Sequence, residues 1–240
     1  YVNDLRALPN LGCRTTGPAL EELLKRNHRV VRRDGRATGA WSGWDRYAPR
    51  PLRSGGALPR RLYSFMWRQR FRFPKFFRAF RSLDASLGAL HDFVCRDPFL
   101  SVDLFGRFCV HEPSLKSLFE DIKSVDAVVV NGEGTLIFGR PMQRDALYLL
   151  FLLALAQGYQ KPTFLLNAMI SDSPDTGASG EDVRLAGEVL GRCCRVGCRD
   201  LSSYELAKSW WPQLEESLEF IPDALFSWMD RFRAARDLVK

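Results

Sequence analysis

The chain has 240 residues, of which 46% are hydrophobic and 12% aromatic, a composition typical of a globular protein with a substantial core. Its longest apolar run, residues 147–156, is about half as long as a membrane-spanning helix, so we expect a buried helix there. The first residues have neither the basic region nor the apolar stretch of a signal peptide. These features exclude a membrane-spanning protein and predict a cytoplasmic one.

The formal net charge of +7 is unevenly distributed along the chain. Nine arginines, one lysine and no acidic residue lie between Arg50 and Arg81. The rest of the chain therefore carries a small net negative charge. The basic character belongs to one segment and not to the whole fold.

The first predicted elements are a strand, a loop and a helix. Pro9, Asn10 and Gly12 are expected to end the strand, and Thr15 or Thr16 is expected to cap a helix that runs to about residue 24. The sequence that follows this helix is less regular.

A second strand is predicted over residues 28–33, where valines lie between arginines. Residues 34–61 are rich in Gly, Pro, Arg and Trp and show little periodicity, which predicts an irregular segment. We expect it to belong to a basic, aromatic-rich insertion at about 34–110.

Residues 62–81 interleave arginines with Phe, Tyr and Trp, and three interpretations of this pattern stay open. Such stretches lie on anionic membrane surfaces, and similar ones bind single-stranded nucleic acid. A third interpretation is a basic helix whose aromatic side chains face the protein's own core. We expect a peripheral contact with an anionic membrane through this segment, and no nucleic-acid partner.

After this segment the pattern becomes regular. Helical spacing of apolar residues at 82–94 and 112–124 is followed by an alternation of predicted strands and helices. Strands are predicted at 125–130, 163–168, 194–200 and 217–221, and helices at 145–157, 181–191 and from Ser202 or Ser203 to Trp210. This alternation predicts an α/β domain with a Rossmann-like parallel sheet flanked by helices.

Polar or glycine-rich stretches follow five of the predicted strands. They are Asn10 with Gly12, residues 131–135, residues 167–174, Arg199 with Asp200, and Asp223. Because ligands of parallel sheets gather beyond the carboxyl ends of the strands, we expect these stretches to converge on one site.

Four of these stretches resemble the polysaccharide pyruvyltransferase family, in the family's order. They are an Asn-x-Gly loop at residues 10–12, a glycine-rich turn Asn-Gly-Glu-Gly-Thr at 131–135, an Arg-Asp-x-x-Ser pattern at 199–203 and a Pro-Asp-x-x-Phe pattern at 222–226. The resemblance covers nearly the whole chain outside the insertion. It implies the amino-terminal lobe of a two-lobed enzyme of the glycosyltransferase-B-like kind, with the carboxyl-terminal lobe expected to be absent.

The resemblance implies transfer of a pyruvyl group from phosphoenolpyruvate to a sugar hydroxyl of a cell-surface polysaccharide. It implies no metal and no organic cofactor, and leaves the catalytic acid or base unknown. Two alternatives are a nucleotide-sugar glycosyltransferase and a catalytically inactive homologue that binds glycan or membrane. The substrate-binding residues that it implies are Asn10, Gly12, Gly132, Gly134, Thr135, Arg199, Asp200, Ser203 and Asp223.

The chemistry of the individual residues leaves other roles open. Arg199 suits a carboxylate or phosphate because guanidinium binds either in a bidentate manner, but it could also form a structural ion pair. Asp200 and Ser203 could cap the helix that follows them. Asp223 could orient a sugar hydroxyl or stabilise a turn.

The glycine-rich turn could hold a ligand with open backbone amides or could simply be a tight turn. Position 137 is Ile, so the Gly-x-Gly-x-x-Gly dinucleotide fingerprint is absent, and so is the Lys-Ser/Thr pair of a P-loop. His111 could act as a general base, although a histidine before a helix is more often a surface or capping residue.

The cysteines lack the paired Cys-x-x-Cys spacing of a zinc site. We expect free, buried thiols, with a disulfide or metal framework as the alternative. The six cysteines are Cys13, Cys95, Cys109, Cys193, Cys194 and Cys198.

Overall fold

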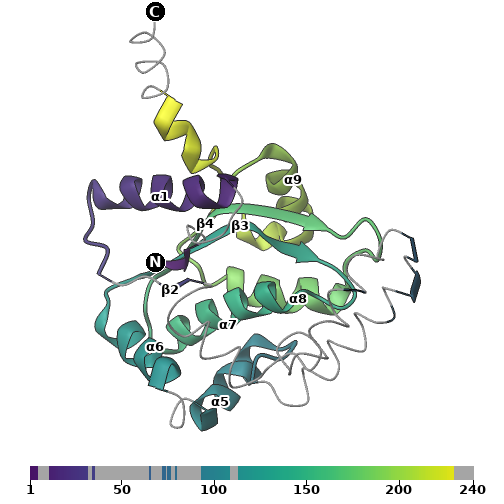
Figure 1. Ribbon diagram of the computed structural model, residues 1–240, viewed down its shortest axis with the longest axis horizontal. Helices are drawn as coiled ribbons and strands as arrows, with labels where there is room; N and C mark the ends of the chain where they lie inside the picture. The colour runs from purple at the N-terminus through teal and green to yellow at the C-terminus, as the bar shows by residue number, and fades with distance from the viewer. Residues whose placement is uncertain are drawn as a thin grey trace, which may run out of the picture.

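Figure 1 shows the computed structural model of the chain. The structure describes residues 1–4, 11–31, 34–35, 93–108 and 113–229, together with the isolated positions 65, 72, 73, 75, 76 and 79. The predictions for Asn10, for His111 and for most of 34–92 therefore fall outside the described residues.

A parallel sheet organises the described part of the chain. Its strand order is β2-β1-β3-β4-β5-β6, and every neighbouring pair is parallel. The direction of winding reverses between β1 and β3, as in doubly wound Rossmann-like sheets. The predicted α/β fold with a Rossmann-like parallel sheet is confirmed. The strands are β1 (Val2–Asp4), β2 (Asp34–Gly35), β3 (Val128–Phe138), β4 (Thr163–Asp172), β5 (Arg195–Cys198) and β6 (Leu218–Phe220).

Helices cover both faces of this sheet. In Figure 1, α1 lies on one side of β3 and β4, while α7 and α8 lie on the other side with α5 and α6 beyond them. Helix α9 packs against β4 and β6. The helices are α1 (Leu11–Lys25), α5 (Pro98–Phe108), α6 (Pro113–Ser124), α7 (Arg144–Gly158), α8 (Gly180–Leu190) and α9 (Leu201–Trp210), with short 3-10 helices η1 (Pro212–Leu214) and η2 (Ala224–Trp228).

Helix α7 forms the centre of the core. All of residues 148–156 are buried, because β3 and β4 cover one side of the helix and α5 covers another. Phe151 packs with its ring centroid 5.2 Å from those of Phe93 and Phe105. The apolar run in the sequence is therefore a buried helix, as predicted, and no helix within the described ranges is long and apolar enough to cross a membrane.

The amino-terminal predictions need correction. Helix α1 begins at Leu11, so Gly12 lies in its first turn and not in a loop. Thr16 is a buried residue inside the helix, and neither it nor Thr15 caps the start. Residues 28–31 form no strand, and the second strand is the two-residue β2.

Strand β3 is longer than predicted. Residues 131–135 lie inside it and not in a loop after it, because β4 pairs with β3 on both sides of this stretch, from Val128 to Phe138. The register shifts between Glu133 and Leu136, so the glycine-rich stretch forms an irregularity within the strand. Helix α5, which the sequence did not predict, packs on α7 from within the expected insertion.

Candidate functional site

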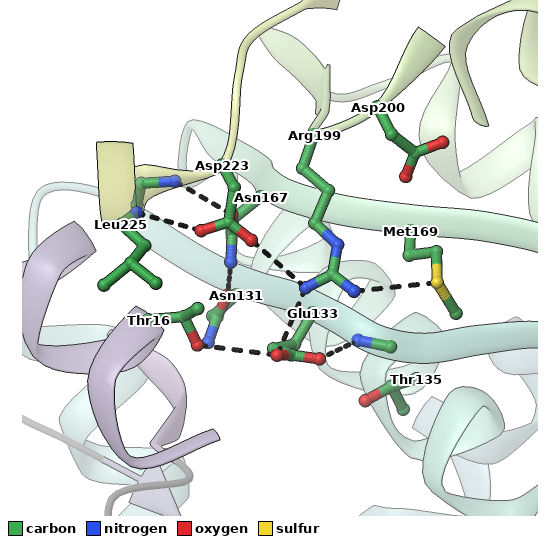
Figure 2. A network of polar contacts seen from close by, with 12 residues as sticks. Thr16, Asn131, Glu133, Thr135, Asn167, Met169, Arg199, Asp200, Asp223 and Leu225 are labelled. Atoms are coloured by element: carbon green, nitrogen blue, oxygen red, sulfur yellow. Dashed lines mark hydrogen bonds and ion pairs between the residues drawn. The ribbon is translucent and has the colours of Figure 1, made fainter. Parts of the chain in front are cut away.

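Arg199 lies at the centre of a polar cluster beyond the carboxyl end of β5. Its Nη1 atom is 3.1 Å from Oε1 of Glu133 on β3 and 3.4 Å from Oδ2 of Asp223, which follows β6. Nη2 contacts the Met169 sulfur at 3.6 Å. Figure 2 shows the guanidinium group between these partners. The structure thus brings together four of the five stretches that the sequence places at one sheet edge.

Backbone pairing places these side chains. The Arg199 N–H donates to the carbonyl of Ala168 at 2.9 Å, and the Ile221 N–H donates to Cys198 at 2.8 Å. These bonds continue the sheet ladder to the end of β5. Asp223 is fixed independently, because its Oδ1 accepts the Leu225 N–H at 2.9 Å and so caps η2.

The carboxylate of Glu133 is held by three donors. Besides Arg199, Oε2 accepts the backbone N–H of Gly134, and Oε1 lies 3.5 Å from the hydroxyl of Thr16 on α1. Figure 2 shows Arg199 and Thr16 approaching the carboxylate from different elements of the fold. The side chain of Glu133 is only 12% exposed, so solvent reaches this ion pair only in part.

The two glycines of the stretch have different roles. A Cβ on Gly132 would lie 2.6 Å from the Cβ of Ala168, so glycine there permits the close approach of β3 and β4. A Cβ on Gly134 would meet only the end of Met169, at 3.6 Å. The Gly134 amide is already bonded to Glu133, which corrects the expectation of an open amide at that position. Thr135 is buried, with its hydroxyl 3.4 Å from the Asn3 amide nitrogen.

Three buried asparagines connect the strands beneath the cluster. Asn3 donates to the carbonyl of Asn131 at 2.7 Å, and the Asn131 side chain accepts from Asn167 at 3.1 Å. The Oδ1 atom of Asn167 in turn accepts the Ala224 N–H at 3.2 Å. This asparagine network joins β1, β3 and β4 to the start of η2, and so supports the backbone next to Asp223.

Three of these strand residues have left-handed backbone conformations. The φ angles are 64° at Asn3, 41° at Glu133 and 54° at Asn167, and the strand register is irregular near each of them. Non-glycine residues in this region cluster at functional sites. Sequence analysis missed the asparagine network. The available signal was an asparagine within each of β1, β3 and β4, since asparagine is depleted in strands and tolerates positive φ.

Asp200 and Ser203 have local structural roles. Asp200 caps α9 by accepting the Ser203 N–H at 2.8 Å, and it also accepts the Ser203 hydroxyl at 2.9 Å. The hydroxyl oxygen of Ser203 accepts the Ile170 N–H at 2.9 Å. In Figure 2 the Asp200 carboxylate points away from the Arg199 guanidinium. The capping role of Asp200 is confirmed, whereas Ser203 lies inside α9, which begins at Leu201, so the prediction that Ser202 or Ser203 caps this helix is wrong.

Cys198, the neighbour of Arg199 in the chain, supplies no charged group to the cluster. Burial, with a smaller contribution from Asp200, raises the pKa of the Cys198 thiol to about 12, so this thiol is neutral beside Arg199 at neutral pH. Cys95, Cys193, Cys194 and Cys198 are free thiols; Cys193 and Cys198 are buried as predicted, whereas Cys194 is exposed and Cys95 only partly buried. Among the residues that the structure describes, no group of His, Cys, Asp and Glu side chains has the arrangement of a metal site.

The charge of the cluster limits what it binds in this arrangement. One guanidinium faces two carboxylates, so these three side chains carry a net negative charge. Carboxylates accept hydrogen bonds from hydroxyl groups, as sugars provide, whereas an added anion would be repelled. An anionic ligand can therefore use Arg199 only if a carboxylate leaves it.

Comparisons with protein-family models, with curated proteins and with solved structures found no match to this chain. The resemblance to polysaccharide pyruvyltransferases thus depends on the four sequence stretches, and the geometry of the cluster must be interpreted by its own chemistry.

Proposed function

We propose that this chain is a polysaccharide pyruvyltransferase-like protein that transfers a pyruvyl group from phosphoenolpyruvate to sugar hydroxyls of a cell-surface polysaccharide. One observation carries the proposal: Glu133, Arg199 and Asp223, from three of the four stretches that resemble the family, are in direct contact. The stretches are separated along the chain, so nothing in their local sequences requires this contact.

In the proposed reaction two sugar hydroxyls add to the central carbon of phosphoenolpyruvate, its methylene becomes a methyl group, and inorganic phosphate leaves. One hydroxyl proton reaches the methylene carbon and the other leaves with phosphate. Arg199 binds the carboxylate or phosphate of the donor. Asp223 accepts a hydrogen bond from an acceptor hydroxyl, and the acid that protonates the methylene carbon lies outside this cluster.

Release of inorganic phosphate from phosphoenolpyruvate tests the proposal. The assay uses methyl galactoside and methyl glucoside as acceptors, because each offers the pair of nearby hydroxyls that a ketal requires. We expect acceptor-dependent phosphate release and a ketal product detectable by mass spectrometry. Absence of release with every acceptor would contradict the proposal.

A matched pair of variants locates the reaction. Arg199→Ala is expected to reduce the rate by about 100-fold or more, since it removes a charged contact to the donor. Arg195→Ala removes the first residue of β5, an arginine that pairs with exposed Glu219, and it should leave the rate unchanged. Equal rates for wild type and Arg199→Ala would show that this cluster is not the site.

A second candidate is a nucleotide-sugar glycosyltransferase. It is favoured by the reversal of sheet winding between β1 and β3, because doubly wound sheets bind nucleotides at such a switch point. The excess of carboxylates also suits ribose and sugar hydroxyls. Thermal stabilisation by UDP-glucose, with none from phosphoenolpyruvate, would favour this candidate over the first.

A further inference from the structure

The carboxylate of Glu133 is bound in the way a small anion is bound. A guanidinium group, a backbone N–H and a hydroxyl, from Arg199, Gly134 and Thr16, all face it. Charged donors and backbone amides are the groups that recognise carboxylate and phosphate ligands. In this structure the anion that these groups bind is the protein's own Glu133 carboxylate.

The backbone of Glu133 does not account for a glutamate at this position. Its φ of 41° lies in the left-handed region, where glycine is the favoured residue. A residue with a Cβ is strained there, so the contacts of the carboxylate must compensate for the strain.

The two carboxylates on Arg199 differ in how firmly they are held. Asp223 has a short side chain, and its other oxygen caps η2 through the Leu225 N–H. Glu133 has one more rotatable bond, and both of its oxygens contact groups that would also bind a ligand anion. Glu133 is therefore the carboxylate that can be exchanged without disturbing a helix.

We propose that Arg199, the Gly134 amide and Thr16 form a binding site for a carboxylate or phosphate group, and that Glu133 fills this site until a ligand anion displaces it. Rotation of the Glu133 side chain removes the net negative charge that would repel the ligand and frees the guanidinium. This inference rests on the proposed function for the role of the site, but the anion exchange itself is measurable without turnover.

Isothermal titration calorimetry with inorganic phosphate, acetate and phosphoenolpyruvate tests the exchange. Glu133→Gln removes the charge of the internal anion, and Glu133→Gly removes the side chain and suits the backbone. We expect binding of phosphate or acetate to tighten about tenfold in Glu133→Gln and further in Glu133→Gly, because a charge-assisted competitor is lost. Comparison of the phosphate and acetate arms shows which group the site prefers.

Glu219→Gln is the matched control. It removes one negative charge from a 48% exposed glutamate that pairs with Arg195, so it changes the net charge of the protein equally. Unchanged anion affinity in this control, with tightening in the Glu133 variants, supports the proposal. Tightening in all three variants would mean a general charge effect and would overturn it.

Adding Arg199→Ala to Glu133→Gly should abolish the gained affinity, and a double variant that keeps it would overturn the assignment of the site. Thermal melting of each variant verifies folding, and Glu133→Gly serves if Glu133→Gln does not fold.

If wild type transfers pyruvate but the Glu133 variants bind anions no better, the exchange fails while the proposed function survives. If the Glu133 variants bind phosphate more tightly but neither wild type nor any variant uses phosphoenolpyruvate, the exchange is supported and the proposed function fails.

Discussion

The two sides of the sheet are built by different physical means. On the side of α7, large apolar side chains are buried in one continuous cluster that includes Phe93, Phe105 and Phe151. On the side of α1 and η2, a smaller cluster contains Ala19, Leu20 and Ala224. There the asparagine network and the ion pairs of Arg199 provide specific connections between strands.

This difference shows where the chain keeps freedom to bind a ligand. Apolar packing is non-directional and excludes water, so the α7 side holds the fold together mainly by burial of apolar surface and not by positioned polar groups. Hydrogen bonds and ion pairs are directional and exchange partners readily. The polar side therefore combines positioned groups with the ability to replace an internal partner by an external one.

The largest expected effect tests the apolar side. Phe151→Ala removes a fully buried ring from contact with two other phenylalanines, and it should lower the free energy of unfolding by about 3–5 kcal/mol. Phe220→Ala, at a 47% exposed position on β6, should cost less than about 1 kcal/mol. Chemical denaturation measures both. Similar costs for the two would contradict the assignment of the main core to α7.

The apolar side was largely predictable from the sequence. The uninterrupted run at 147–156 has too few residues to span a membrane and too many for a buried strand, so a buried helix was the remaining choice. The parallel sheet followed from alternating elements. Helix α5 was missed because the packing on α7 that stabilises it is not visible in its local sequence.

The polar side was predictable only in outline. The sequence placed residues 131–135, Arg199 and Asp223 at the same edge of the sheet, because strand ends of a parallel sheet must meet there. It did not reveal which groups pair. The local sequence gave no sign that Glu133 is the partner of Arg199, because this contact depends on a strand register that local sequence does not encode.

The next effect concerns the asparagine network. Asn167→Gly introduces a residue that adopts the φ of 54° without strain. It removes the side-chain hydrogen bonds to Asn131 and to the Ala224 N–H. We expect a loss of about 1–3 kcal/mol in the free energy of unfolding, since buried polar partners are left unpaired. Gln160→Gly is the control, at a φ of 55° in an exposed turn. It should be neutral or stabilising by less than about 1 kcal/mol.

The outcome of that comparison separates two explanations for the left-handed residues. If Asn167→Gly and Gln160→Gly have the same effect on stability, backbone strain alone explains the asparagine, and the network contributes nothing measurable. If only Asn167→Gly is destabilising, the side-chain amide holds η2 against β4.

The smallest expected effect distinguishes Asp200 from its neighbour Arg199. Asp200→Ala removes the cap of α9 and should cost about 1 kcal/mol, whereas Asp200→Asn keeps a capping oxygen and should change the free energy of unfolding by less than about 0.5 kcal/mol. Neither variant should alter anion affinity, because the Asp200 carboxylate is bonded to Ser203 and points away from the guanidinium. Weaker anion binding in Asp200→Asn with unchanged stability would place Asp200 in the site and extend the polar cluster from Arg199 to the start of α9.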